Sequence, residues 1–141
     1  MKNTTVFTIV LLFVISFATS NCTADHNFIP STEEILTRNG WEVDYYFQQH
    51  DMTGEFSEYR ITFRTSGTIY CRTGNEVNSG SWNLVMDPSQ PEIININLNT
   101  TNPCVNKLSG SWILVNKYSS TMNFENGQPP SASIMHIRIK P

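Results

Sequence analysis

The feature that most constrains this chain is a two-residue alternation of apolar and polar side chains, which recurs from residue 41 to residue 139. It is clearest where Ile94, Ile96 and Leu98 alternate with asparagines. This period is typical of strands with one buried face, and turn-forming Gly, Pro, Asn or Asp residues separate the segments. About eight strands are predicted, with inward rows at Trp41, Val43, Tyr45 and Phe47; Tyr59, Ile61 and Phe63; Ile69 and Cys71; Trp82, Leu84 and Met86; Ile94, Ile96 and Leu98; Leu108, Trp112 and Leu114; Met122 and Phe124; and Met135, Ile137 and Ile139.

One short helix is predicted, ahead of the first strand. Ser31-Thr32-Glu33-Glu34 fits a capping box, so we expect a helix from Thr32 to about Arg38 that ends at Asn39-Gly40. A meander that buries one face of every strand has to close or stack, and closure removes its exposed edges. The predicted fold for residues 31–141 is therefore all-β: a roughly eight-stranded antiparallel up-and-down barrel with a short N-terminal helix.

The N-terminal segment has the pattern of an export signal. Lys2 is followed by an apolar run from Val6 to Ala18, which is too short to span a bilayer and has the length of a secretory signal core. Residues 1–21 are predicted to be a signal peptide and residues 22–30 a tether. Two cleavages compete: one after Ser20, which releases a free chain, and one before Cys22, whose thiol would carry a diacylglycerol.

The cleavage before Cys22 is favoured by a resemblance to a known signal. The residues from Thr19 to Cys22 resemble the lipobox of bacterial lipoproteins in placing cysteine at the end of the apolar core, and depart from it at Thr19 and Asn21. The resemblance implies an outer-membrane-anchored lipoprotein of the cell envelope, with the lipid at Cys22 as the only membrane contact. A secreted or periplasmic protein is the alternative.

The three cysteines can be assigned together. Export implies an oxidising compartment, which makes Cys71 and Cys104 a candidate disulfide. If Cys22 is lipidated, the odd count becomes one anchor and one pair.

The sequence contains no recognisable catalytic or metal-binding motif. His26, His50 and His136 have no Ser or Cys nucleophile at a recognisable spacing, so we do not expect an enzyme. No His or Cys pair has the spacing of a metal site, and we expect no metal or cofactor. A net charge of -3 gives no general attraction for phosphate backbones, which argues against nucleic-acid binding.

Glycine followed by tryptophan recurs in the chain, at Gly40-Trp41, Gly80-Ser81-Trp82 and Gly110-Ser111-Trp112. With the strand order, these segments make residues 31–141 resemble the small bacterial lipocalin-like lipoproteins. The resemblance implies an eight-stranded meander barrel in the cell envelope that binds a small apolar molecule.

Two functions stay open at this point, because an eight-stranded barrel either holds one small ligand or is filled by its own side chains. In the first, a small apolar or aromatic molecule contacts the aromatic interior at Trp41, Tyr45, Tyr59, Trp82, Trp112 and Phe124. In the second, a filled barrel is a protein-interaction or inhibitor module that presents an uncharged outer face, including Asn95, Asn97, Asn99, Thr100 and Thr101. An internal pocket above roughly 300 Å³ would favour the ligand.

Overall fold

The computed structural model describes residues 30–127 and 132–140. The predicted signal peptide and all of the predicted tether except Pro30 lie outside the described residues. The elements in chain order are α2 (Thr32–Arg38), β1 (Gly40–Gln48), β2 (His50–Asp51), the 3-10 helix η2 (Thr53–Phe56), β3 (Arg60–Phe63), β4 (Thr68–Thr73), β5 (Glu76–Val85), β6 (Ile93–Asn99), α3 (Pro103–Asn106), β7 (Gly110–Lys117), β8 (Thr121–Asn126) and β9 (Ser133–Ile139).

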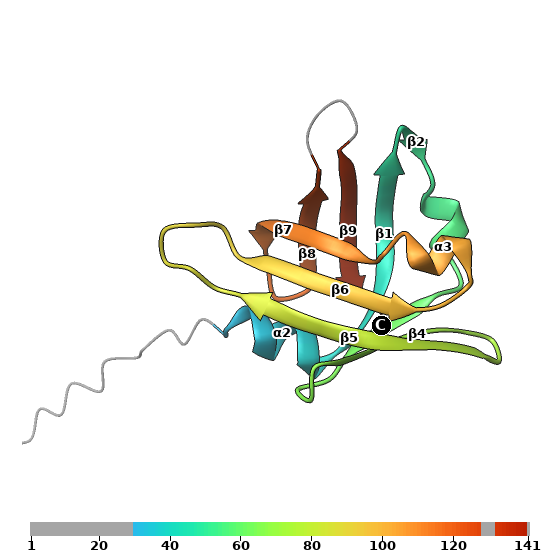
Figure 1. Cartoon of the computed structure of the whole chain (residues 1–141), viewed down its shortest axis with the longest axis horizontal. Helices are drawn as coiled ribbons and strands as arrows, with labels where there is room; N and C mark the ends of the chain where they lie inside the picture. The colour runs from blue at the N-terminus through green and yellow to red at the C-terminus, as the bar shows by residue number, and fades with distance from the viewer. Residues whose placement is uncertain (1–29, 128–131, 141) are drawn as a thin grey trace, which may run out of the picture.

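Eight strands form a closed antiparallel barrel, which confirms the predicted fold class (Figure 1). From β3 to β9 each strand pairs with the next along the chain, and β1 pairs with both β3 and β9. The ladder that closes the ring runs from Trp41 opposite Ile139 to Gln48 opposite Ser133. The short strand β2 folds back onto the end of β1.

Helix α2 covers one end of the barrel. Its predicted capping box is present: the N–H of Glu34 donates to Ser31 Oγ (3.2 Å), and the N–H of Ser31 donates to the Glu34 carboxylate (2.9 Å). Leu36 is fully buried beneath the helix, and its carbonyl accepts a hydrogen bond from the indole N–H of Trp41 at 2.9 Å. The helix is therefore joined to the start of β1 through the core.

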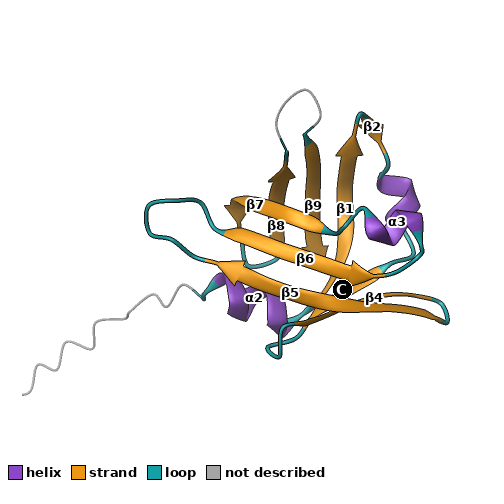
Figure 2. Ribbon diagram, in the orientation of Figure 1, coloured by secondary structure: helices purple, strands orange, loops and turns teal. Residues whose placement is uncertain are grey.

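The opposite end is covered by η2 and α3, two helices that the sequence analysis does not predict (Figure 2). The Asn102 side chain accepts hydrogen bonds from the N–H groups of Cys104 (3.0 Å) and Val105 (3.2 Å), and Pro103 occupies the first turn. Asn followed by Pro is thus a helix start as well as a turn signal. Val105 and Phe56 are fully buried at this end.

The predicted inward positions of Tyr45 and Phe47 are wrong. The β1–β9 register shifts between Val43 and Tyr45, so the strand carries a bulge at Asp44. An extra residue reverses the alternation that follows it. Tyr46 therefore enters the core at 1% exposure, while Tyr45 and Phe47 are half-buried on the outer surface.

Most other predicted inward residues are buried, and Met86 is the clear exception at 65% exposure. Strand β5 ends at Val85, so Met86 already belongs to the turn that contains Asp87 and Pro88. Tyr59, Leu84, Leu114 and Ile139 are partly buried against the core.

The bulge predicts that alanine substitution at two neighbouring tyrosines lowers the stability of the domain by very different amounts. Tyr46→Ala should lower the free energy of unfolding by about 3–5 kcal/mol, because a fully buried ring leaves a cavity. Tyr45→Ala, the matched control on the outer face, should cost about 1 kcal/mol or less. Urea unfolding measures both values, and an equal or reversed cost would contradict the observed register.

Candidate functional site on the outer barrel surface

The barrel interior holds four of the six residues predicted to bind a ligand. Trp41, Trp82, Trp112 and Phe124 point inward and are at most 6% exposed. They pack with other large buried side chains: the ring centroids of Trp82 and Phe63 are 5.2 Å apart, and those of Trp112 and Tyr46 are 6.1 Å apart. These aromatics therefore form the core of the domain.

The polar groups of the interior tryptophans are already bonded to the main chain. Besides the Trp41 bond, the indole N–H of Trp82 donates to the Arg64 carbonyl at 3.0 Å, and that of Trp112 donates to the Leu108 carbonyl at 2.8 Å. A ligand would have to break such a bond to accept a hydrogen bond from the indole N–H, and a buried polar group left unpaired is costly. This pattern is typical of structural tryptophans.

The two predicted tyrosines lie away from this core and from each other. Tyr59 is near α3, where its hydroxyl accepts a hydrogen bond from the Asn102 side chain at 3.0 Å. Tyr45 lies on the outer surface, with its ring centroid 5.3 Å from that of His136 and 6.5 Å from that of Phe47. The six residues therefore do not converge on one site.

Three cavities of the described structure have volumes of 200, 260 and 220 Å³, and all are open to the surface. The first crosses the outer face of β7, β8, β9 and β1, the second lies beside η2, and the third lies at the α2 end near Trp82 and Met86. Each is smaller than the roughly 300 Å³ at which small-molecule sites begin.

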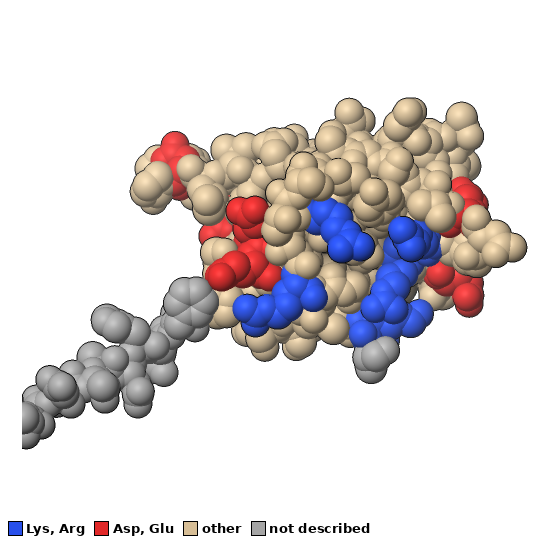
Figure 3. Space-filling view, turned by 90° about the horizontal axis from the view of Figure 1, so that it is seen from below, with Lys and Arg blue, Asp and Glu red and all other residues tan. Residues whose placement is uncertain are grey.

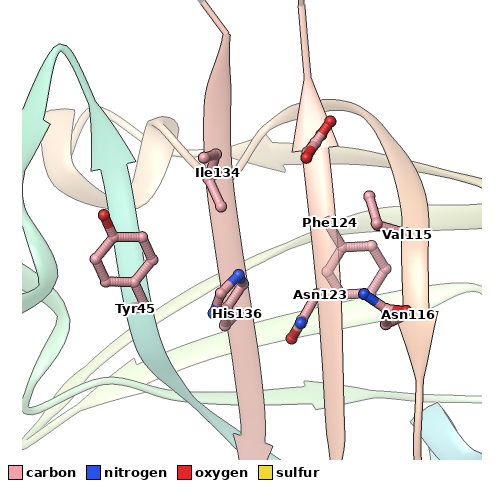
Figure 4. A pocket seen from close by; sticks show the side chains of 8 residues that line it. Tyr45, Val115, Asn116, Asn123, Phe124, Ile134 and His136 are labelled. Atoms are coloured by element: carbon pink, nitrogen blue, oxygen red, sulfur yellow. The ribbon is translucent and has the colours of Figure 1, made fainter.

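The first cavity, called the outer groove here, combines apolar walls with amide and imidazole groups (Figure 4). Tyr45, His136 and Asn123 lie on three neighbouring strands, and the register places Asn123 opposite both His136 and Asn116. The ladder shifts at Val115, which makes a second bulge and leaves that side chain 48% exposed. The remaining lining residues are Phe124, Glu125 and Ile134.

A row of apolar side chains runs along this edge of the barrel. The cross-strand registers align five apolar residues and one carboxylate on the outer face, in the order Val85, Ile93, Ile113, Glu125, Ile134 and Phe47. Val85 is 43% exposed and Ile113 is 37% exposed, and Val115 lies beside them. The alternation does not predict this outer apolar row, because it assigns Val85, Ile93, Ile113 and Ile134 to solvent-facing positions and Phe47 to the interior.

Glu125 interrupts the outer apolar row between Ile113 and Ile134. It is exposed, and no Lys, Arg or His of the described residues lies within ion-pairing distance of it. A carboxylate between two isoleucines gives the row one negative charge at its middle.

The predicted disulfide is not formed: Cys71 and Cys104 are both free thiols. Burial raises the pKa of the Cys71 thiol to about 12, with further increases from the nearby Cys104 and Glu76. Burial and the Glu55 carboxylate raise the pKa of Cys104, whose sulfur lies 3.4 Å from the Glu55 carbonyl. The pairing was inferred from export to an oxidising compartment and from the cysteine count, neither of which positions two sulfur atoms. A raised pKa keeps both groups protonated at neutral pH and opposes a nucleophilic role.

Within residues 30–127 and 132–140, no cluster of three or more His, Cys, Asp or Glu residues is arranged to hold a metal ion. The described helices are also too short and polar for any of them to cross a bilayer.

Comparison with known proteins supports the fold. No protein-family model matches the chain, and neither does any curated protein sequence. Among solved structures, the chain is similar to a DUF4847 family protein from Bacteroides vulgatus ATCC 8482, with 15% identity and a TM-score of 0.55. That match covers 77% of this chain and 96% of the other. At this identity the similarity shows a shared barrel fold, and the lipocalin-like lipoprotein resemblance is supported only to that extent.

Proposed function

We propose that this protein is an exported, lipid-anchored barrel that binds a protein partner on its outer surface. The anchor is proposed from the sequence: the apolar run from Val6 to Ala18 ends just before Cys22. Multiple acyl chains at one cysteine hold a protein stably at a membrane. Only the short segment 22–30 would separate this anchor from α2, so the barrel would stay close to the membrane of the cell envelope.

The partner function is inferred from the way apolar side chains are divided between the inner and the outer face of the barrel. The interior aromatics pack on each other and bond to the main chain, whereas the described residues leave the outer apolar row half-buried or exposed. Exposed apolar side chains rimmed by polar residues are typical of protein interaction sites. The packed interior makes the small-molecule function predicted from the sequence the weaker alternative.

The chemistry of the outer groove favours an extended segment with one apolar side chain and one cation. At 200 Å³ the groove is small for an independent ligand, and Tyr45, Val115 and Ile134 supply an apolar wall for one inserted side chain. Asn116 and Asn123 can pair with the main chain of a bound segment. The unpaired Glu125 carboxylate attracts a Lys or Arg next to that side chain.

The anchor predicts fatty-acid labelling that depends on one residue. Cells that express the full chain and receive an alkyne fatty acid should label the wild type and the Cys104→Ser control equally, whereas Cys22→Ser should lose the label. Gel fluorescence after click coupling measures the label. Equal labelling of Cys22→Ser would contradict the anchor.

The groove predicts a peptide specificity that depends on Glu125. Phage selection of random peptides on the immobilised protein should enrich an aromatic or aliphatic residue next to Lys or Arg. Fluorescence anisotropy with a selected peptide should show binding at least about tenfold weaker for Glu125→Lys, because attraction becomes repulsion. Glu58→Lys is the control, since it makes the same charge change at an exposed position outside the groove.

A second matched pair tests the apolar contact. Val115→Ser should weaken peptide binding, while Val77→Ser, at a comparably exposed position on β5, should not. No enriched peptide, or a peptide that binds wild type and Glu125→Lys equally, would overturn the proposal. Self-association through the row, measured by sedimentation velocity and abolished by Val115→Ser, would also overturn it in favour of a second copy as the partner.

A further inference from the structure

A second surface of the barrel, on the side away from the outer groove, differs from the groove in the chemistry of its side chains. Apart from Val77, Val85 and Ile93, the outward side chains of β3 to β6 are arginines, one tyrosine and uncharged hydrogen-bonding groups. We call this surface the basic face, and it includes Arg64 in the β3–β4 turn. Its other residues lie opposite one another on neighbouring strands in four rows: Arg60 and Arg72; Thr62, Tyr70, Ser79 and Asn99; Thr68, Ser81 and Asn97; and Asn83 and Asn95.

The arginines of the basic face have no carboxylate partners. Arg60 and Arg72 are directly opposite each other, and among the described residues no Asp or Glu forms an ion pair with Arg60, Arg64 or Arg72. None of the outward positions of β3 to β6 is acidic. Seen from below, the molecule shows several Lys and Arg side chains near the middle of the view, with Asp and Glu toward its edges (Figure 3).

Like charges directly opposite each other destabilise a strand pair. Glu58, two residues before Arg60, forms no ion pair with these arginines, and neither does Glu76 at the start of β5. Glu76 accepts hydrogen bonds from Asn78 (2.8 Å) and Asn102 (3.1 Å) at the α3 end, and these lower its pKa. A chain with a net charge of -3 thus concentrates unpaired positive charge on one face.

Two local contacts hold these arginines against the sheet. The Arg72 guanidinium lies over the Tyr70 ring, with its carbon 5.3 Å from the ring centroid. Arg60 lies across Gly40, and its Nε would be 2.4 Å from a Cβ added at that glycine. Only glycine at position 40 leaves room for the guanidinium in this position. Arginines held in this way lose less freedom when they bind an anion.

We propose that the basic face binds an acidic polysaccharide whose sugar carboxylates pair with Arg60, Arg72 and Arg64. Guanidinium groups match carboxylates bidentately. Exposed Ser79, Ser81, Asn97 and Asn99 offer donors and acceptors for sugar hydroxyls between the charges. Arg60 and Arg64 are four residues apart, about 13 Å at the rise of a strand, so the face engages successive charges of an extended chain.

The outer groove and the basic face use different strands and can therefore be tested independently. Isothermal titration of the wild type with polygalacturonate should show binding that weakens with added salt, and neutral dextran should not bind. Arg60→Ser/Arg72→Ser should weaken the binding at least about tenfold, because two charge-assisted contacts are lost. Arg138→Ser/Lys140→Ser is the matched control, since it removes the same charge from residues that are paired with Glu42.

The variant Gly40→Ala distinguishes binding that needs the observed position of Arg60 from a general attraction between charges. It keeps every charge but displaces the Arg60 guanidinium, so it should also weaken polygalacturonate binding. Wild-type affinity in Gly40→Ala, or an equal loss in the Arg138→Ser/Lys140→Ser control, would overturn the proposal. Tighter binding to phosphatidylglycerol vesicles or to a DNA oligonucleotide than to polygalacturonate would overturn it as well.

Discussion

The structure depends on the ladder between β1 and β9, which closes the barrel. An open sheet of these strands would leave two unpaired edges and could not enclose its apolar face. Closure turns every second side chain inward, and the space inside an eight-stranded ring is narrow enough to be filled by them. The two ends are then covered from within the chain, by Leu36 of α2 on one side and by Phe56 and Val105 on the other.

Because the barrel is closed and filled by its own side chains, its outer surface is the place where a ligand can bind. Three indole N–H groups bond to main-chain carbonyls and join neighbouring elements: β1 to α2, β5 to the β3–β4 turn, and β7 to the residues just before it. Moving these side chains for a ligand would loosen the contacts that hold the ends of the barrel. Binding on the outer surface has no such cost, and the outer surface carries both the outer apolar row and the basic face.

The fold was predictable from the sequence because the alternation of apolar and polar residues reports directly on burial. Ile94, Ile96 and Leu98 are buried as their pattern predicts, and the capping box at Ser31 begins the helix as expected. The alternation fails at Asp44 and Val115, where a bulge adds one residue to a strand. Three consecutive aromatic residues from Tyr45 to Phe47 give no signal for the shift, since each is compatible with either face.

The candidate sites were less predictable, for a physical reason. Alternation separates inside from outside, but it does not show which outward residues become neighbours. Ile113 and Ile134 come together only through the register with Glu125, and Arg60 and Arg72 only through the pairing of β3 with β4. The 44 Asn, Thr and Ser residues among 141 indicate from composition alone that the surface is largely uncharged. Only the strand registers show that some of these residues surround three arginines without a described ion-pair partner.

The central claim is that side chains fill the barrel and that ligands bind outside it. Native mass spectrometry combined with tryptophan fluorescence tests it most directly, in titrations of the purified protein with fatty acids and aromatic metabolites. We predict no bound mass and no quenching of Trp41, Trp82 or Trp112. A bound small molecule that quenches this fluorescence, and that is lost when Trp112 is replaced by Phe, would contradict the account.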